Sequence, residues 1–332
     1  MRRPTQSLSS ALAPAITSYL ALKRALGRRF TNEGVILAHL DRFLAVQCPA
    51  APAVTPDAFA AWTLTLVHLT PTVRRNWMRI VRNLCLYLRR RAPSSFIPDS
   101  SGFPPPHAPL RPHIFTEQQI VALLRIATDL RPASTSPLRA EVYRVAIVLL
   151  YTAGLRRGEL ARLVLSDYDF EAHTVLVRAS KFHKSRLVAL SKDGADEMDR
   201  FLRARRRLPH DADSPLLVSN VGGSRAYWGA SLGIGLTGLF RCADIRTARG
   251  RLPRVHDLRH TYAVHALLRW YRAGVDVQAK LPILSAAMGH VSIASTAYYL
   301  PFLEPIAEAA SARFARHCQD VLAGPPSAPG DP

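Results

Sequence analysis

The stretch His256-Asp257-Leu258-Arg259-His260 decides the fold of this 332-residue chain when it is combined with three other segments. Gly289-His290 and the tyrosine pair Tyr298-Tyr299 follow it. Upstream, Gly154-Leu155-Arg156-Arg157-Gly158-Glu159-Leu160 adds another arginine in a turn that runs into a helix. Together these segments hold guanidiniums, imidazoles and a phenol, which are the groups needed to bind a phosphate and attack it.

Attack on a phosphodiester without a metal needs a nucleophile, donors for the two non-bridging oxygens, and an acid for the departing oxygen. Arginine suits the second task because its fork matches two phosphate oxygens. Arg156 is expected at the start of a helix, where the helix dipole also favours an anion. His256 and Arg259 lie three residues apart, so both project from one face of a helix. Each of these motifs alone is weak evidence. The interpretation depends on the order and spacing of all the motifs in the chain.

Composition favours a globular protein that binds a polyanion. The chain has 44 Lys and Arg against 24 Asp and Glu, a formal net charge of +20, and its hydrophobic content of 48% is ample for a core. Its length favours two domains. The four cysteines are far apart and form no CxxC pair: Cys48, Cys85, Cys242 and Cys318. We therefore expect reduced thiols rather than disulfide bonds or a zinc site.

Neither a secretory signal nor a membrane span is expected. The basic start Met1-Arg2-Arg3-Pro4 is not followed by an uninterrupted apolar region, and no apolar stretch has the length of a membrane span. We expect a cytoplasmic, nucleoid-associated protein that shares a compartment with DNA. No metal or cofactor is expected.

A proline-rich stretch divides the chain. Prolines crowd together with serine and glycine over residues 91–113, which predicts an extended linker rather than a helix. The expected organisation is a helical domain over residues 1–92, a linker over 93–113, a second domain over 114–322 and a frayed tail over 323–332.

The N-terminal domain is predicted to be helical over residues 11–26, 32–47, 56–68 and 72–91. In the last helix one face carries an apolar stripe of Trp77, Ile80, Val81, Leu84 and Leu88. The opposite face carries Arg75, Arg79, Arg82 and Arg89. Such a helix packs on one side and can lie against a phosphate backbone on the other, although a solvated basic face gives the same pattern.

The second domain is predicted to be mainly α with a small β-sheet. Residues 174–179 and 186–190 are β-rich runs that flank Lys181-Phe182-His183-Lys184, so a hairpin is expected. Helices are expected over 116–129, 141–152, from near 157, and then over 194–206, 225–240, 257–273, 276–287, 293–299 and 303–321.

The order of these motifs resembles that of the phage integrase family of tyrosine recombinases, over residues 116–314. Gly154 to Leu160 matches the family's Gly-Leu-Arg-x-x-Glu-Leu turn, and His256 to Thr261 matches its His-x-Leu-Arg-His-Thr motif. Met288-Gly289-His290 stands for the Leu-Gly-His box, and Tyr299 lies nine residues after His290. The predicted N-terminal helices are similar in layout to the family's core-binding (SAM-like) domain, and the second domain to its catalytic domain.

The resemblance implies a role for each matching residue. Tyr299 would attack the scissile phosphate and form a 3′-phosphotyrosyl bond, while Arg156 and Arg259 clamp the non-bridging oxygens. Lys181 would protonate the leaving 5′-hydroxyl. His256 and His290 would hydrogen-bond the phosphate, with His256 also able to assist proton transfer from the tyrosine. Glu159 and Asp257 would orient the arginines and histidines, and His260 would be a structural hydrogen-bonding residue.

Two of these assignments leave an alternative. Only the nine-residue spacing selects Tyr299 over Tyr298 as the nucleophile. The hairpin lacks both glycines that usually flank the family's lysine, so Lys184 is a second candidate for the acid.

As a whole, the resemblance implies a site-specific recombinase that closes as a two-domain clamp on duplex DNA and mobilises a transposon or integrative element. The partners it implies are double-stranded DNA, further copies in a synaptic tetramer, and other recombinases of the same element. The amphipathic segment 304–322 would dock on a neighbouring protomer or on its own domain. The alternatives are a catalytically silent architectural subunit and a type IB topoisomerase.

Overall fold

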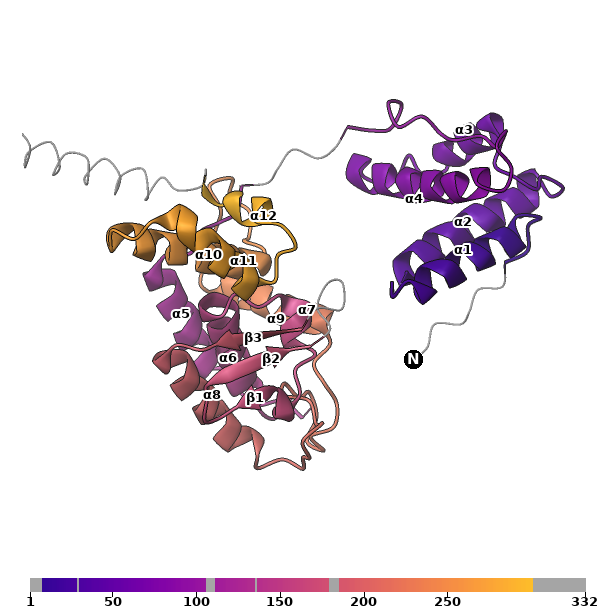
Figure 1. Cartoon of the computed structure of the whole chain (residues 1–332). Helices are drawn as coiled ribbons and strands as arrows, with labels where there is room; N and C mark the ends of the chain where they lie inside the picture. Colours follow the sequence, from indigo (N-terminus) through magenta and orange to yellow (C-terminus); the bar gives the residue numbers. More distant parts are fainter. Residues whose placement is uncertain (1–7, 29, 106–110, 135, 179–184, 301–332) are drawn as a thin grey trace, which may run out of the picture. The chain divides into compact units, whose positions relative to one another are not determined.

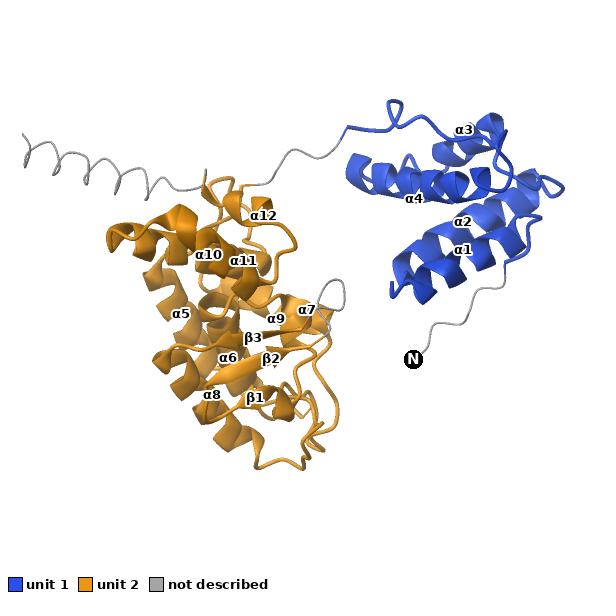
Figure 2. Ribbon diagram, viewed as in Figure 1, with its two compact units in different colours: residues 1–110 blue, residues 111–332 orange. Residues whose placement is uncertain are grey.

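The computed structural model describes residues 8–28, 30–105, 111–134, 136–178 and 185–300. The chain divides into two compact units, residues 1–110 and 111–332 (Figure 2). Both units are mainly helical, and the second contains one small sheet (Figure 1). The predicted fold class is therefore confirmed.

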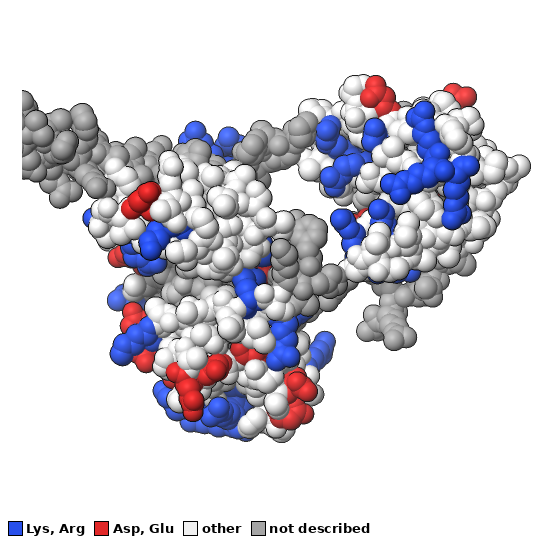
Figure 3. Space-filling model, viewed as in Figure 1, with Lys and Arg blue, Asp and Glu red and all other residues white. Residues whose placement is uncertain are grey.

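The N-terminal unit contains the four predicted helices, each with ends within four residues of the prediction: α1 (Ala13–Ala25), α2 (Thr31–Gln47), α3 (Pro56–Leu64) and α4 (Pro71–Arg89). Proline opens α3 and α4, where its missing N–H is not needed. Trp62 is fully buried at the centre of this unit's core, and the apolar face of α4 packs there through Val81 and Leu84. Many Lys and Arg side chains gather on the face of this unit drawn in Figure 3.

The first part of the proline-rich stretch belongs to this unit, which corrects the predicted linker over 93–113. Phe103 is buried in the unit's core, and Phe96 packs against it. Phe59 meets both rings, at centroid distances of 6.1 Å from Phe96 and 6.2 Å from Phe103. The division falls after Leu110 rather than after residue 92, because these aromatic side chains bind the stretch to the helices.

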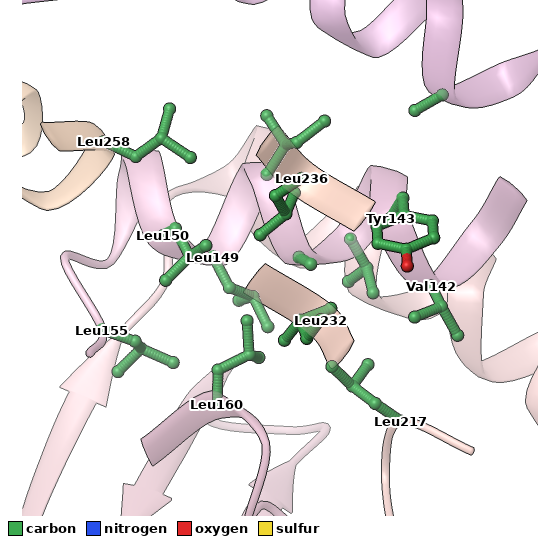
Figure 4. Close-up of a cluster of buried hydrophobic side chains, with 14 of the residues drawn as sticks. Val142, Tyr143, Leu149, Leu150, Leu155, Leu160, Leu217, Leu232, Leu236 and Leu258 are labelled. Atoms are coloured by element: carbon green, nitrogen blue, oxygen red, sulfur yellow. The ribbon is translucent and has the colours of Figure 1, made fainter. Parts of the chain in front are cut away.

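The second unit is built around α6 (Arg139–Thr152), whose side chains at Val142 and Leu149 are fully buried (Figure 4). Contacts link α6 to α5 (Glu117–Thr128), α7 (Arg157–Leu160), α8 (Lys192–Arg205), α9 (Gly229–Cys242) and α10 (His256–Arg272). A Thr116 capping box begins α5. The remaining helices are α11 (Val277–Met288) and α12 (Ala294–Ala297), with a 3₁₀ turn over Leu165–Asp167.

The sheet is antiparallel, in the order β1-β2-β3. The predicted hairpin strands are β2 (Thr174–Val177) and β3 (Arg186–Ala189), paired with Val175 opposite Val188. The sequence did not predict the two-residue strand β1 (Tyr168–Asp169). The pair Tyr168-Asp169 is too short to show an apolar alternation in the sequence. The strand is recognised only because it pairs with β2.

A second cluster of buried side chains in this unit joins α10 to α11. It contains Val264 and Leu267 from α10, Leu284 and Met288 from α11, and Tyr299 from the segment after α12. The candidate nucleophile is therefore a core residue of this part of the fold. Within the described residues, no helix is long and apolar enough to cross a membrane.

Candidate active site

Arg156 sits in a turn whose shape depends on Gly154. Gly154 has φ of +60°, and a Cβ atom there would collide with the ring of Tyr262, so both the backbone conformation and the close packing require glycine. Glu159 fixes the turn, accepting hydrogen bonds from the Arg156 backbone N–H at 2.9 Å and from its Nη1 at 2.7 Å. Since α7 has only four residues, its helix dipole adds little to the positive charge of Arg156.

Arg259 is almost fully buried, with 1% of its surface exposed. Its Nη1 donates to the carbonyl of Gly154 and its Nη2 to the carbonyl of Met288, the latter at 2.5 Å. Burial, followed by the charge of Arg156, lowers the Arg259 pKa to about 10, so the guanidinium stays protonated at neutral pH. Arg259 thereby ties the Arg156 turn to the end of α11.

Three arginines converge on the C-terminal end of α11. Helix C-termini leave carbonyl groups without partners inside the helix. Here three consecutive carbonyls each receive a guanidinium N–H: Ala287 from Arg186 at 2.8 Å, Met288 from Arg259, and Gly289 from Arg156 at 3.0 Å. Gly289 ends the helix with φ of +63°, and His290 follows it directly.

The hydroxyl of Tyr299 lies 3.2 Å from Nδ1 of His260, in the interior of the unit. Tyr299 is 2% exposed, and its ring stacks on that of His290 at a centroid distance of 6.2 Å. The hydroxyl of Thr296 lies 2.8 Å from Nδ1 of His290. The ring of His256 packs edge-on against His260, at 4.6 Å.

The imidazoles of the site are neutral at physiological pH. Burial and the neighbouring positive groups lower the pKa of His260 to about 3 and that of His290 to about 4. The ring of His256 reaches the surface, yet lost hydration and the charges of Arg259 and Arg254 lower its pKa to about 4. Burial raises the pKa of Tyr299, and the charge of Arg259 opposes that rise.

The two acids expected to orient the site are both buried. Burial alone would raise the pKa of Glu159, but hydrogen bonds from Arg186 and Arg156 outweigh it and lower the pKa to about 2. Asp257 accepts from the Arg254 backbone N–H at 2.9 Å and from its guanidinium at 2.8 Å. Asp257 thus fixes the start of α10, and among the described residues its carboxylate hydrogen-bonds to Arg254 rather than to Arg156 or Arg259.

Most residues singled out from the sequence meet in this unit. The site contains Arg156, Glu159, His256, Asp257, Arg259, His260, His290 and Tyr299. The two candidate acids, Lys181 and Lys184, lie outside the described residues, as does segment 304–322. Tyr298 is 38% exposed, in contrast to its buried neighbour Tyr299. No cluster of three or more His, Cys, Asp or Glu suited to a metal ion occurs in the described part of the chain.

Sequence reasoning missed Arg186 and Thr296. A signal for Arg186 was present, because an arginine stands two residues from the apolar Val188 on the inward face of a short strand.

The arginines of α4 that were expected to face DNA have other partners: Arg75, Arg82 and Arg89. They donate to backbone carbonyls of the proline-rich stretch, at Pro104, Pro98 and Pro93, whereas Arg79 bonds to Asn76 on its own helix.

Comparisons with known proteins agree with this geometry. The sequence pattern of the phage integrase family matches residues 113–302, more than half of the chain. A putative integrase/recombinase, y4rB of Sinorhizobium fredii, is 30% identical over 323 residues, covering 94% of this chain and 99% of that protein. The tyrosine recombinase XerA of Pyrococcus horikoshii is 28% identical over 57% of this chain and 56% of its own length.

Solved structures share the fold. The Tn1549 transposon integrase in complex with transposon right end DNA has a TM-score of 0.61 at 18% identity, over 91% of this chain and 98% of that chain. The XerH recombinase bound to its difH substrate after cleavage has a TM-score of 0.62 at 18% identity, over 85% and 79%. By its sequence, its fold and the residues gathered around Tyr299, the chain belongs to the phage integrase family of tyrosine-type site-specific recombinases.

Proposed function

We propose that this protein cleaves and rejoins duplex DNA through a covalent bond between Tyr299 and a 3′-phosphate. One observation carries the proposal: in a single unit, two guanidiniums from separate elements, Arg156 and Arg259, lie beside a buried tyrosine whose hydroxyl is hydrogen-bonded. Family membership supports the same chemistry.

The arginines are prepared for a phosphate by their backbone anchors. A guanidinium has five N–H donors. Among the described residues, Arg156 uses one N–H for Glu159 and one for Gly289, and Arg259 uses one each for Gly154 and Met288. We propose that the remaining donors of both groups serve the non-bridging oxygens, and that Arg259, which is 1% exposed here, becomes accessible when DNA binds. The anchors of both guanidiniums are already formed before that step.

In the cleavage step the phenolic oxygen of Tyr299 forms a bond to phosphorus as the bond to the 5′-oxygen breaks. We assign the phenolic proton, which leaves as the oxygen attacks, to Nδ1 of His260, while the departing 5′-oxygen takes up a second proton from another donor. We assign that second proton to Lys181, with Lys184 as the alternative donor. The phosphotyrosyl ester keeps the energy of the phosphodiester, so the reverse attack by a 5′-hydroxyl reseals the strand without ATP.

Within this proposal we assign the contact with the nucleophile to His260 instead of His256. His260, not His256, is the imidazole whose nitrogen lies at the Tyr299 hydroxyl. A neutral imidazole has one acceptor and one donor nitrogen, so His260 can hold the phenol by accepting its O–H. His256 and His290 keep the proposed role of hydrogen-bonding the phosphate.

Duplex DNA is the proposed partner of both units. The net charge of +20 suits a polyanion, and affinity is expected to fall steeply with salt as counterions are released. In the N-terminal unit Arg79 is exposed and is the proposed phosphate contact of α4. The proline-rich stretch already accepts one N–H group from each of Arg75, Arg82 and Arg89. These arginines would bind phosphate only through their other N–H groups.

The proposed biological role is the movement of a mobile element by a tetramer assembled on DNA, with segment 304–322 joining neighbouring protomers. The support is the near full-length similarity to a putative integrase/recombinase and the fold shared with a transposon integrase. A catalytically silent subunit is not favoured, because such a subunit would have no need to keep Tyr299, Arg156 and Arg259 together.

A nicked suicide substrate tests the proposal. It would carry the end sequence of the element that encodes the protein, and covalent adducts would be resolved on a denaturing gel. We expect an adduct with wild type and with Tyr298→Phe, and none with Tyr299→Phe. Tight binding of wild type without any adduct would contradict the proposed chemistry. An adduct lost in Tyr298→Phe instead would move the nucleophile to that residue.

A further inference from the structure

The side chain of Arg186 is buried in the catalytic unit without belonging to the phosphate-binding pair. It opens β3, where burial alternates: Leu187 is 65% exposed and Val188 is 3% exposed. The Arg186 side chain points inward with Val188 and is 10% exposed. A charged side chain is placed in such a position only with partners that satisfy it.

Arg186 uses all three guanidinium nitrogens. Nη1 and Nη2 form a fork on the Glu159 carboxylate, at 3.1 Å to Oε1 and 2.9 Å to Oε2. Nε donates to the Ala287 carbonyl at 2.8 Å. A lysine could not reproduce this planar, three-point arrangement.

Each partner of Arg186 is one contact away from the proposed chemistry. The same Glu159 carboxylate receives the backbone N–H and Nη1 of Arg156. The Ala287 carbonyl precedes those of Met288 and Gly289, which anchor Arg259 and Arg156. Packing is also tight on this side, since a Cβ atom at Gly289 would lie 2.8 Å from Nη1 of Arg186.

We infer that Arg186 is a positioning residue for strand cleavage, one that aligns Arg156 and the end of α11 without touching the phosphate. This inference rests on the proposed function. Arg186 also helps to keep the Glu159 carboxylate ionised, so that both of its oxygens accept hydrogen bonds from Arg156.

The test compares Arg186→Gln and Arg186→Lys with a matched control, Arg144→Gln. Arg144 forms a similar fork in the same unit, with Glu197 at 2.6 and 3.2 Å, and its other partners are Leu124 and Thr128 on α5. Three quantities would be measured for each protein: the single-turnover cleavage rate on the nicked substrate at saturating protein, the Kd for that substrate, and the Tm.

We expect Arg186→Gln to cleave about 100-fold more slowly, the scale of a small misalignment of catalytic groups. Its Kd should change little, because Arg186 makes no phosphate contact. Arg186→Lys should recover part of the rate. Arg144→Gln should lower the Tm to a similar extent and leave the rate unchanged. Equal slowing by Arg144→Gln at matched Tm would overturn the inference, as would a wild-type rate in Arg186→Gln.

A pH profile adds a readout that a merely structural role would not move. Glu159 stays ionised in wild type because its pKa is held at about 2, chiefly by Arg186 against the effect of burial. We expect the Glu159 pKa to be higher in Arg186→Gln. The cleavage rate of this variant should therefore fall as the pH drops below that raised pKa. The pH–rate profile of wild type should show no such fall. A wild type that forms no adduct would refute the proposed function itself, whereas active wild type with identical variant profiles would refute only the role of Arg186.

Discussion

The Nδ1 atom of His260 lies 3.2 Å from the Tyr299 hydroxyl, and the two ring centroids are 5.4 Å apart. His260 and His256 occupy successive turns of α10, and the T-shaped contact between their rings orients the first toward the phenol. The nucleophile is thus held by an imidazole that follows Arg259 directly in the sequence.

Replacing His260 by phenylalanine should slow cleavage without preventing it. Loss of the hydrogen bond to the phenol would reduce the single-turnover rate about tenfold, the equivalent of a hydrogen bond of about 1.4 kcal/mol. The matched control is His265→Phe, which removes a His–Tyr pair of similar geometry, 3.1 Å to Tyr151, from the same helix. Equal rates in the two variants would show that His260 does not hold the nucleophile.

His260 should also make the unfolding free energy depend on pH. Its pKa is about 3 in the fold, against about 6.5 for an unperturbed histidine. The unfolded chain therefore binds the proton first, and the stabilisation present above pH 6.5 is lost as the pH falls from 6.5 toward 3. Denaturant unfolding at stepped pH should give a curve for His260→Phe that is shallower by about 1.4 kcal/mol per pH unit. Parallel curves would contradict the low pKa.

Gly154→Ala should destabilise the catalytic unit. The new methyl group would collide with the Tyr262 ring, and alanine is strained at φ of +60°. We expect a loss of about 2 kcal/mol in the unfolding free energy. Gly238→Ala is the control, since nothing lies within 4 Å of a Cβ atom there and a helical alanine should be neutral or stabilising. A similar response at both positions would mean that the turn accepts a side chain.

In the N-terminal unit, Arg82→Ala and Arg79→Ala should have different effects. Arg82 donates to Pro98, so its loss should loosen the proline-rich stretch and speed limited proteolysis within residues 93–105. Arg79 bonds only to Asn76 among the described residues. Its loss should leave proteolysis unchanged but reduce the salt dependence of DNA binding by about one phosphate contact. Identical proteolysis of both variants would contradict the packing role of Arg82.

The sequence was sufficient for the helices and for most of the site, because both depend on local patterns. The apolar stripe that includes Val81 and Leu84 predicted α4, and the motif around Arg259 predicted the site helix. The contacts of Arg186 could not be predicted, because Glu159 and Ala287 reach it from elements far apart in the chain. The direction of Arg75 and Arg82 was missed for the same reason: their partners are carbonyls of the proline-rich stretch, which carry no sequence signal.

The α11 anchors have a consequence for how this site tolerates mutation. Arg186 and Arg259 bind main-chain oxygens of Ala287 and Met288, which every amino acid possesses. Substitutions at these two positions that the packing accepts should therefore leave the hydrogen bonds of the guanidiniums intact. Gly289 is the exception, since any side chain there meets Arg186. Apart from the Glu159 carboxylate, the alignment of the arginines thus depends on one glycine and a helix end rather than on a set of matching side chains.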